Sequence, residues 1–159
     1  MAVRALAGSG RRGLVLLCAL LAAGCNDVRD FRGTWEGRRV GDDPALLVGT
    51  FGTVPGPPSL EPPAVVTITT LDRHGMHGHL AIEGAIDTAL DSLPGAEADV
   101  LAGITFDGAP LRVYMAFVAV AEGGDAMAIV SLYEDDRVDL RLLRGGSSPL
   151  YAIYSLGRR

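Results

Sequence analysis

The chain has no lysine, because all 14 of its basic residues are arginine, and this excludes every mechanism that needs a lysine amine. It has two cysteines in 159 residues. Long apolar runs are also missing: the longest, residues 13–23, falls well short of the ~20 residues that a membrane-spanning helix needs. A retained transmembrane anchor is therefore not expected.

The first 24 residues have the three parts of a secretory signal. Arg4, Arg11 and Arg12 give a positive start, and no acidic residue precedes Asp27. The apolar run follows, and the small residues at positions 22–24 provide a cleavage site. The sequence therefore predicts an exported protein from which residues 1–24 are removed.

The segment Leu20-Leu21-Ala22-Ala23-Gly24-Cys25 resembles the end of a bacterial lipoprotein signal peptide. The resemblance implies that Cys25 receives acyl chains and becomes the new N-terminus. Ala22 departs from the pattern, which usually has a larger aliphatic residue there, and an ordinary cleavage site is the alternative. Asn26 after the cysteine implies the outer membrane, on its periplasmic or surface face, rather than the inner membrane.

Processing before Cys25 would leave a signal (1–24), a short tether (25–30) and one domain (31–159). It removes three of the 14 basic residues and none of the 19 acidic ones, so 11 positive against 19 negative charges leave −8. This charge argues against nucleic acid and against a polybasic membrane patch. With Cys25 as the sole remaining cysteine, and that one acylated, neither an intramolecular disulfide nor a thiol enzyme is expected.

The rest of the chain has the rhythm of an all-β domain, with short apolar runs separated by Gly, Pro and Asp. The runs predict nine strands: 34–40, 46–51, 65–71, 77–86, 100–106, 111–120, 126–133, 138–144 and 150–156. No window shows a helical stripe, and residues 85–93 are the best place for a helical turn. About eight or nine strands predict a small antiparallel barrel, with a two-sheet β-sandwich as the alternative.

Two of the expected strands have informative faces. In 111–120 both faces are largely apolar, which predicts either a central strand covered on both sides or an apolar outer patch. In 138–144, apolar residues alternate with Asp139 and Arg141, which predicts that the polar face is solvated. The crowded prolines of 55–63 exclude a central strand there and predict an extended loop.

Gly33-Thr34-Trp35 opens the domain and includes the chain's one tryptophan. Together with the strand count, this resembles the lipocalin-like, or calycin, barrels, in which such a tryptophan plugs one end. The resemblance implies a structural role for Gly33 and Trp35 and an arginine packed over the ring, for which Arg144 and Arg158 are the choices. Burial of the ring also predicts one hydrogen-bond partner for the indole N–H.

All three histidines fall within six residues, at His74, His77 and His79. On a strand His77 and His79 point to the same side, roughly 7 Å apart at their Cα atoms. Imidazole is a common ligand of zinc, copper and nickel, so the cluster could hold a metal ion. The alternative is that both side chains are simply the solvent-facing positions of a half-buried strand.

Catalytic patterns are sparse. No serine lies in a Gly-x-Ser-x-Gly elbow, and no phosphate-binding loop is present. The sequence therefore favours a non-catalytic, lipid-anchored envelope protein that needs no cofactor and binds a protein partner or a small apolar ligand. A metal-binding protein using the three histidines and a hydrolase with a site assembled across strands remain alternatives.

Overall fold

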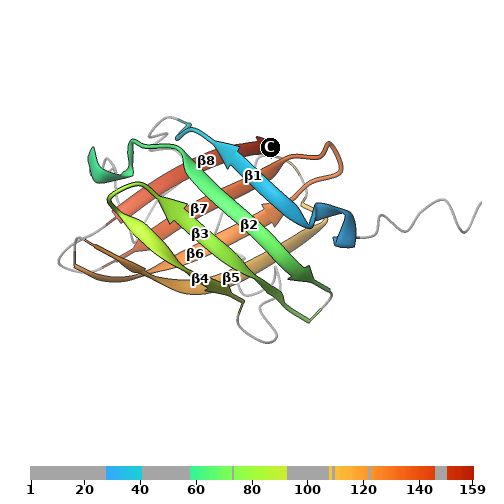
Figure 1. Ribbon diagram of the computed structural model, residues 1–159, viewed down its shortest axis with the longest axis horizontal. Coiled ribbons are helices and arrows are strands. Elements are labelled where there is room, and N and C mark those ends of the chain that lie inside the picture. The colour runs from blue at the N-terminus through green and yellow to red at the C-terminus, as the bar shows by residue number, and fades with distance from the viewer. Residues whose placement is uncertain are drawn as a thin grey trace, which may run out of the picture.

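The computed structural model describes residues 28–40, 58–72, 74–92, 108, 110–121, 123–145 and 150–159. These residues form one antiparallel sheet of eight strands in the order β4-β3-β2-β1-β8-β7-β6-β5. Strands that are neighbours in sequence pair with each other, except that β4 and β5 form the two edges of the sheet. Because β1 also pairs with β8, the sheet curls into a nearly closed barrel (Figure 1). The prediction of an all-β antiparallel barrel is confirmed.

The strand bounds follow the apolar runs closely. They are β1 Gly33–Gly37, β2 Ala64–Leu71, β3 Met76–Ile82, β4 Ile86–Asp91, β5 Arg112–Val120, β6 Gly124–Leu132, β7 Val138–Arg144 and β8 Leu150–Arg158. Two short 3-10 helices, η1 Val28–Phe31 and η3 Pro58–Leu60, precede β1 and β2. The strands expected at 46–51 and 100–106 lie outside the described residues.

The region 77–93 differs from expectation. The single strand expected at 77–86 is two strands, and the helical turn expected at 85–93 is β4. Gly84 has a φ of +76°, and Ala85 N–H donates to the Ile82 carbonyl at 2.9 Å, which closes a tight β3–β4 hairpin. This turn has only Gly84 as a local signal, so the sequence did not separate the strands.

The sheet closes through point contacts rather than a ladder at the β4–β5 seam. Among the described residues, Ala121 N–H donates to the Ala85 carbonyl at 2.8 Å at one end. The Tyr114 hydroxyl donates to the Asp72 carbonyl at 2.7 Å at the other. In the described sheet β5 is therefore an edge strand. Of the two alternatives predicted for 111–120, the central strand is wrong.

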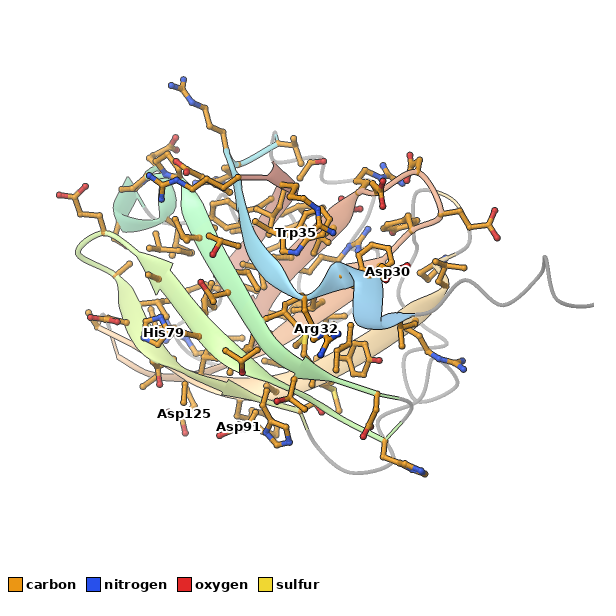
Figure 2. All side chains as sticks on the ribbon, turned by 45° about the vertical axis from the view of Figure 1, so that its right-hand side comes forward. Asp30, Arg32, Trp35, His79, Asp91 and Asp125 are labelled. Carbon is orange, nitrogen blue, oxygen red and sulfur yellow. The ribbon has the colours of Figure 1, made fainter. Side chains whose placement is uncertain are left out.

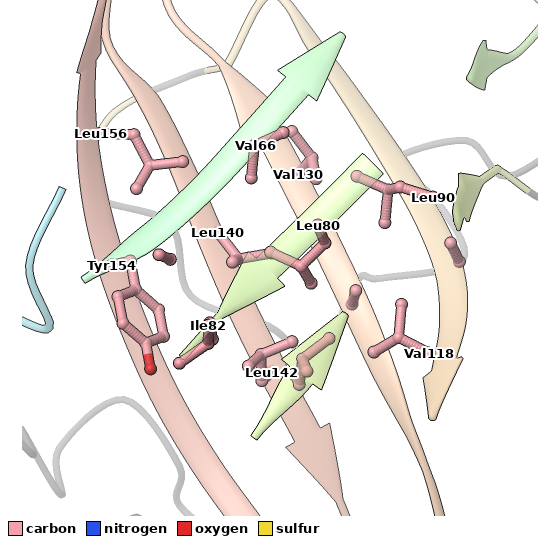
Figure 3. Packing of buried hydrophobic residues seen from close by; sticks show 14 of the residues in the cluster. Val66, Leu80, Ile82, Leu90, Val118, Val130, Leu140, Leu142, Tyr154 and Leu156 are labelled. Carbon is pink, nitrogen blue, oxygen red and sulfur yellow. The ribbon is translucent and has the colours of Figure 1, made fainter. Parts of the chain in front are cut away.

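The barrel interior is filled by its own side chains. Leu80, Leu140 and Leu142 interdigitate with residues of the facing strands (Figure 3), and each has none of its surface exposed. Val66 and Val130 are equally buried. A ligand-sized cavity of about 300 Å³ or more would expose surface on the side chains that line it. These residues have none, so they leave no such space beside them.

Candidate functional site

Trp35 is a core residue of β1 and pairs with Arg158 near the end of the barrel where β1 begins and β8 ends, which we call the tether end. None of its surface is exposed, and its indole Nε1–H donates to the Phe31 carbonyl at 2.8 Å. The Phe31 ring stacks on it at a centroid distance of 5.6 Å. The predicted burial and single partner of Trp35 are confirmed.

Arg158 is the arginine that packs over Trp35. Its guanidinium carbon lies 4.5 Å from the ring centroid, at the end of β8. The same group donates to the carbonyls of Asp30 at 2.5 Å and Arg32 at 3.1 Å. Arg144, the other choice, instead bonds the turn between β5 and β6. The last strand therefore fastens the segment that links the barrel to residue 25.

The histidines do not form one ligand group. His77 Nδ1 lies 2.7 Å from Asp91 Oδ1, and His79 Nε2 lies 2.9 Å from Asp87 Oδ1, so each pairs separately across β3 and β4. His79 and Asp91 come from these neighbouring strands (Figure 2). Among the described residues, no three His, Cys, Asp or Glu side chains gather closely enough to hold a metal ion.

His74 lies in the β2–β3 hairpin turn, before β3 begins at Met76. The Asp72 carboxylate accepts the backbone N–H groups of His74 and Gly75 at 2.7 and 3.0 Å. The hydrogen bond from His74 lowers the pKa of Asp72 below its usual value. Asp72 is thus a turn residue here.

Gly78 sits between the two strand histidines for a packing reason. A Cβ atom at this position would lie 2.0 Å from the Thr67 carbonyl oxygen of β2. Only glycine allows this approach of β3 to β2, which occurs where the register between the two strands shifts between Ile68 and Thr70. His77 and His79 lie on the outer side of the sheet, with 59% and 49% of each side chain exposed.

Ser92 is a residue that the sequence did not single out. Ser92 follows Asp91 in the sequence. A Cβ atom built on Gly75 would lie 3.2 Å from Ser92 Oγ and 3.9 Å from His77 Nε2, so both side chains surround this position. Serine, histidine and aspartate are therefore neighbours here. However, the Ser92 hydroxyl accepts the Met76 N–H at 2.7 Å, and Asp91 is 67% exposed. A triad needs a serine–histidine hydrogen bond and an enclosed carboxylate, and this group has neither within the described residues.

A second apolar cluster lies on the outer side of β5–β8. Its members alternate along each strand with the residues of the interior core. The buried members are Val113, Ile129, Leu143, Tyr151 and Ile153, and Met115 and Met127 pack against them. β5 is apolar on both faces because one face lies in the barrel core and the other belongs to this outer cluster.

Polar residues continue this outer face on β6 and β7. Arg141 is 2% exposed and Asp139 is 4% exposed, so the expectation of a solvated face on β7 is wrong. Arg141 donates to the Ser131 hydroxyl at 3.4 Å and lies 3.7 Å from Asp139. Burial, and then the Asp139 charge, raise the pKa of the neighbouring Tyr133 hydroxyl. The alternation of apolar and polar residues in the sequence could not show whether the polar face of β7 is buried or exposed to solvent.

Phe117 is the exposed part of this outer face. Its surface is 60% exposed, and of the other large apolar side chains described only Val40 is comparably exposed. Across the β5–β6 ladder it stands opposite Met127, while Met115 lies two residues back on the same side. Phe117, Met115 and Met127 form what we call the β5 strip. It is an accessible apolar surface beside a buried apolar cluster.

The predicted lipidation site, Cys25, lies outside the described residues. No helix among those residues is long and apolar enough to cross a membrane. No known protein family, curated protein or solved structure matches the chain. The arguments for function therefore come from the sequence and from the geometry given above.

Proposed function

We propose that this protein is a non-catalytic lipoprotein of the bacterial cell envelope whose barrel binds a protein partner through the β5 strip. The main support for a protein partner is Phe117, an exposed aromatic side chain on an edge strand. Exposed aromatic and methionine side chains are typical of the centres of protein interfaces. The filled interior favours this partner over a small apolar ligand inside the barrel.

The signal-like residues 1–24 and the following cysteine support the anchor. Because Ala22 departs from the usual lipoprotein pattern, the alternative is an ordinary signal-peptide cleavage site without lipidation of Cys25. Asn26 favours the outer membrane over the inner membrane. We expect at least two acyl chains, since one chain gives only marginal membrane binding.

The anchor is tested by the intact mass of protein extracted from membranes. The expected mass is that of residues 25–159 with acyl chains added at Cys25. A Cys25→Ala variant should leave the membrane fraction. Detection of a processed but unacylated chain would contradict the lipoprotein assignment.

The partner site is tested by site-specific photocrosslinking in intact cells. A crosslinker in place of Phe117 should give a discrete adduct with an envelope protein. The matched control is Thr70, which is also exposed but belongs to β2, outside the β5–β8 half of the sheet. A Met127→Glu change should abolish the Phe117 adduct. Identical adducts from both positions, or none from Phe117, would refute the β5 strip as the binding surface.

A further inference from the structure

Aspartates border the β5 strip on both of its sides. On β6, Asp125 stands opposite Ala119, which is the next outward position after Phe117. On β4, Asp87 and Asp91 alternate with core residues, so both point outward. All three aspartates are exposed, and Figure 2 shows Asp91 and Asp125 pointing away from the barrel on the same side. The strip therefore lies between two acidic borders.

The β4–β5 seam fixes where the aspartates of β4 lie along the strip. The two strands run in opposite directions, because every pairing in the sheet is antiparallel. Counting along both strands from the hydrogen bond between Ala85 and Ala121 places Asp87 level with the residue two positions after Phe117, and Asp91 level with the residue two positions before it. The two aspartates are thus roughly 14 Å apart along β4, with Phe117 midway.

The arginines of β5 and β7 do not cancel this charge. Arg112 begins β5, about 17 Å along the strand from Phe117. Arg144 donates to two backbone carbonyls of the β5–β6 turn at 2.9 and 3.2 Å, and Arg141 is buried beside Asp139. The exposed Glu83 of the β3–β4 turn adds a fourth carboxylate to the three aspartates. Among the described residues around the strip, exposed carboxylates therefore outnumber arginines with exposed surface.

The histidines of β3 leave the border accessible. His79 pairs with Asp87 and His77 pairs with Asp91 from the side away from β5. The two aspartate side chains still have 85% and 67% of their surface exposed. Since an ionised carboxylate has about four acceptor positions, each aspartate can accept further donors from the β5 side.

We infer that the partner presents to the β5 strip an extended segment in which an apolar residue is flanked by lysine or arginine. This inference rests on the proposed protein partner. The apolar residue packs against Phe117, while the two cations reach the aspartates before and after it. In an extended segment, residues i, i+2 and i+4 point to one side, and i and i+4 are roughly 14 Å apart. This spacing matches that of Asp87 and Asp91.

The same charges disfavour two other occupants of the strip. A second copy of the chain docked strip to strip would bring its own aspartates against these, and like charges across an interface lower affinity. Anionic phospholipid headgroups would be repelled for the same reason. A segment with positive charge is therefore the occupant that fits these borders.

The photocrosslinker at Phe117 tests the charge requirement when the adduct yield is measured in isolated cell envelopes. Asp87→Asn/Asp125→Asn should lower the yield about two- to tenfold, and high salt should have a similar effect. The matched control is Asp135→Asn/Asp136→Asn, which removes the same charge from exposed positions in the β6–β7 turn, at the opposite end of β6 from Asp125. Asparagine tolerates the φ of +56° at position 136, so this control should fold and keep the full yield.

Mass spectrometry of the crosslinked peptide reads the chemistry of the partner directly. We expect lysine or arginine on both sides of the linked residue, within four positions of it. A peptide without these residues, an adduct with lipid or with a second copy of the chain, or equal yields from the two double variants would overturn the inference and leave the β5 strip as a contact surface. Absence of any adduct from Phe117 would refute the proposed protein partner as well.

Discussion

The contact between Arg158 and Trp35 gives the sharpest prediction for stability. Replacing Arg158 with alanine removes a cation–π contact at 4.5 Å and two hydrogen bonds to the carbonyls of Asp30 and Arg32. The cation–π contact is worth about 0.5–1 kcal/mol at an exposed site, and each hydrogen bond contributes about 1 kcal/mol. We therefore expect Arg158→Ala to lower the free energy of unfolding by about 2–3 kcal/mol.

Urea unfolding followed by the emission of Trp35 measures this directly, because the protein has one tryptophan. Arg158→Lys keeps the charge but loses the planar fork, so it should recover only part of the stability. Arg38→Ala, at an exposed site after the other end of β1, should change stability by less than about 0.5 kcal/mol. If Arg158→Ala also costs less than this, the contacts of Arg158 with Trp35, Asp30 and Arg32 do not stabilise the barrel.

Three further predictions test other parts of the structure. Gly78→Ala forces a Cβ against the backbone of β2 and should lower the free energy of unfolding in urea by about 1–3 kcal/mol. The control Gly157→Ala should leave stability unchanged, because a Cβ there meets nothing within 4 Å. Equal effects of the two substitutions would disprove the tight approach of β3 to β2. Burial raises the pKa of Tyr114 from 10.0 to about 12, so the unfolded chain loses this proton first and stability should decline from pH 10 to 12. Stability measured across that range should decline less in Tyr114→Phe, and an identical decline would contradict the assignment. Zinc should not raise the melting temperature, because no three ligands converge in the described residues; a rise that is lost in His77→Ala/His79→Ala would restore the metal-binding alternative.

The sequence predicted the fold class well, because strand formation leaves a local pattern. Turn residues and period-two apolar runs located β2, β5, β6, β7 and β8 to within a few residues. The β3–β4 hairpin was missed because its turn has one glycine and its second strand alternates with alanine and aspartate. Prediction from the local sequence pattern fails where a tight turn lacks the usual turn residues.

The candidate sites were less accessible to sequence reasoning. The structural role of Trp35 followed from its type, since a large ring with one N–H predicts burial and one partner. Its arginine could not be chosen, because Arg158 lies 123 positions away along the chain and only the pairing of β1 with β8 brings them together. The separate pairing of the histidines likewise depends on β4, whose register places carboxylates beside them.

The sequence by itself determined the all-β class, the absence of lysine and the formal charge of −5, because each follows from composition or local order. The export signal, the charge of −8 after its removal and the loss of disulfide chemistry stay predictions. Only the tertiary structure decided which polar residues are buried and which arginine covers Trp35. It alone also showed that β5 is an edge strand with an exposed Phe117. These depend on strand order and register, which join residues that are distant in sequence.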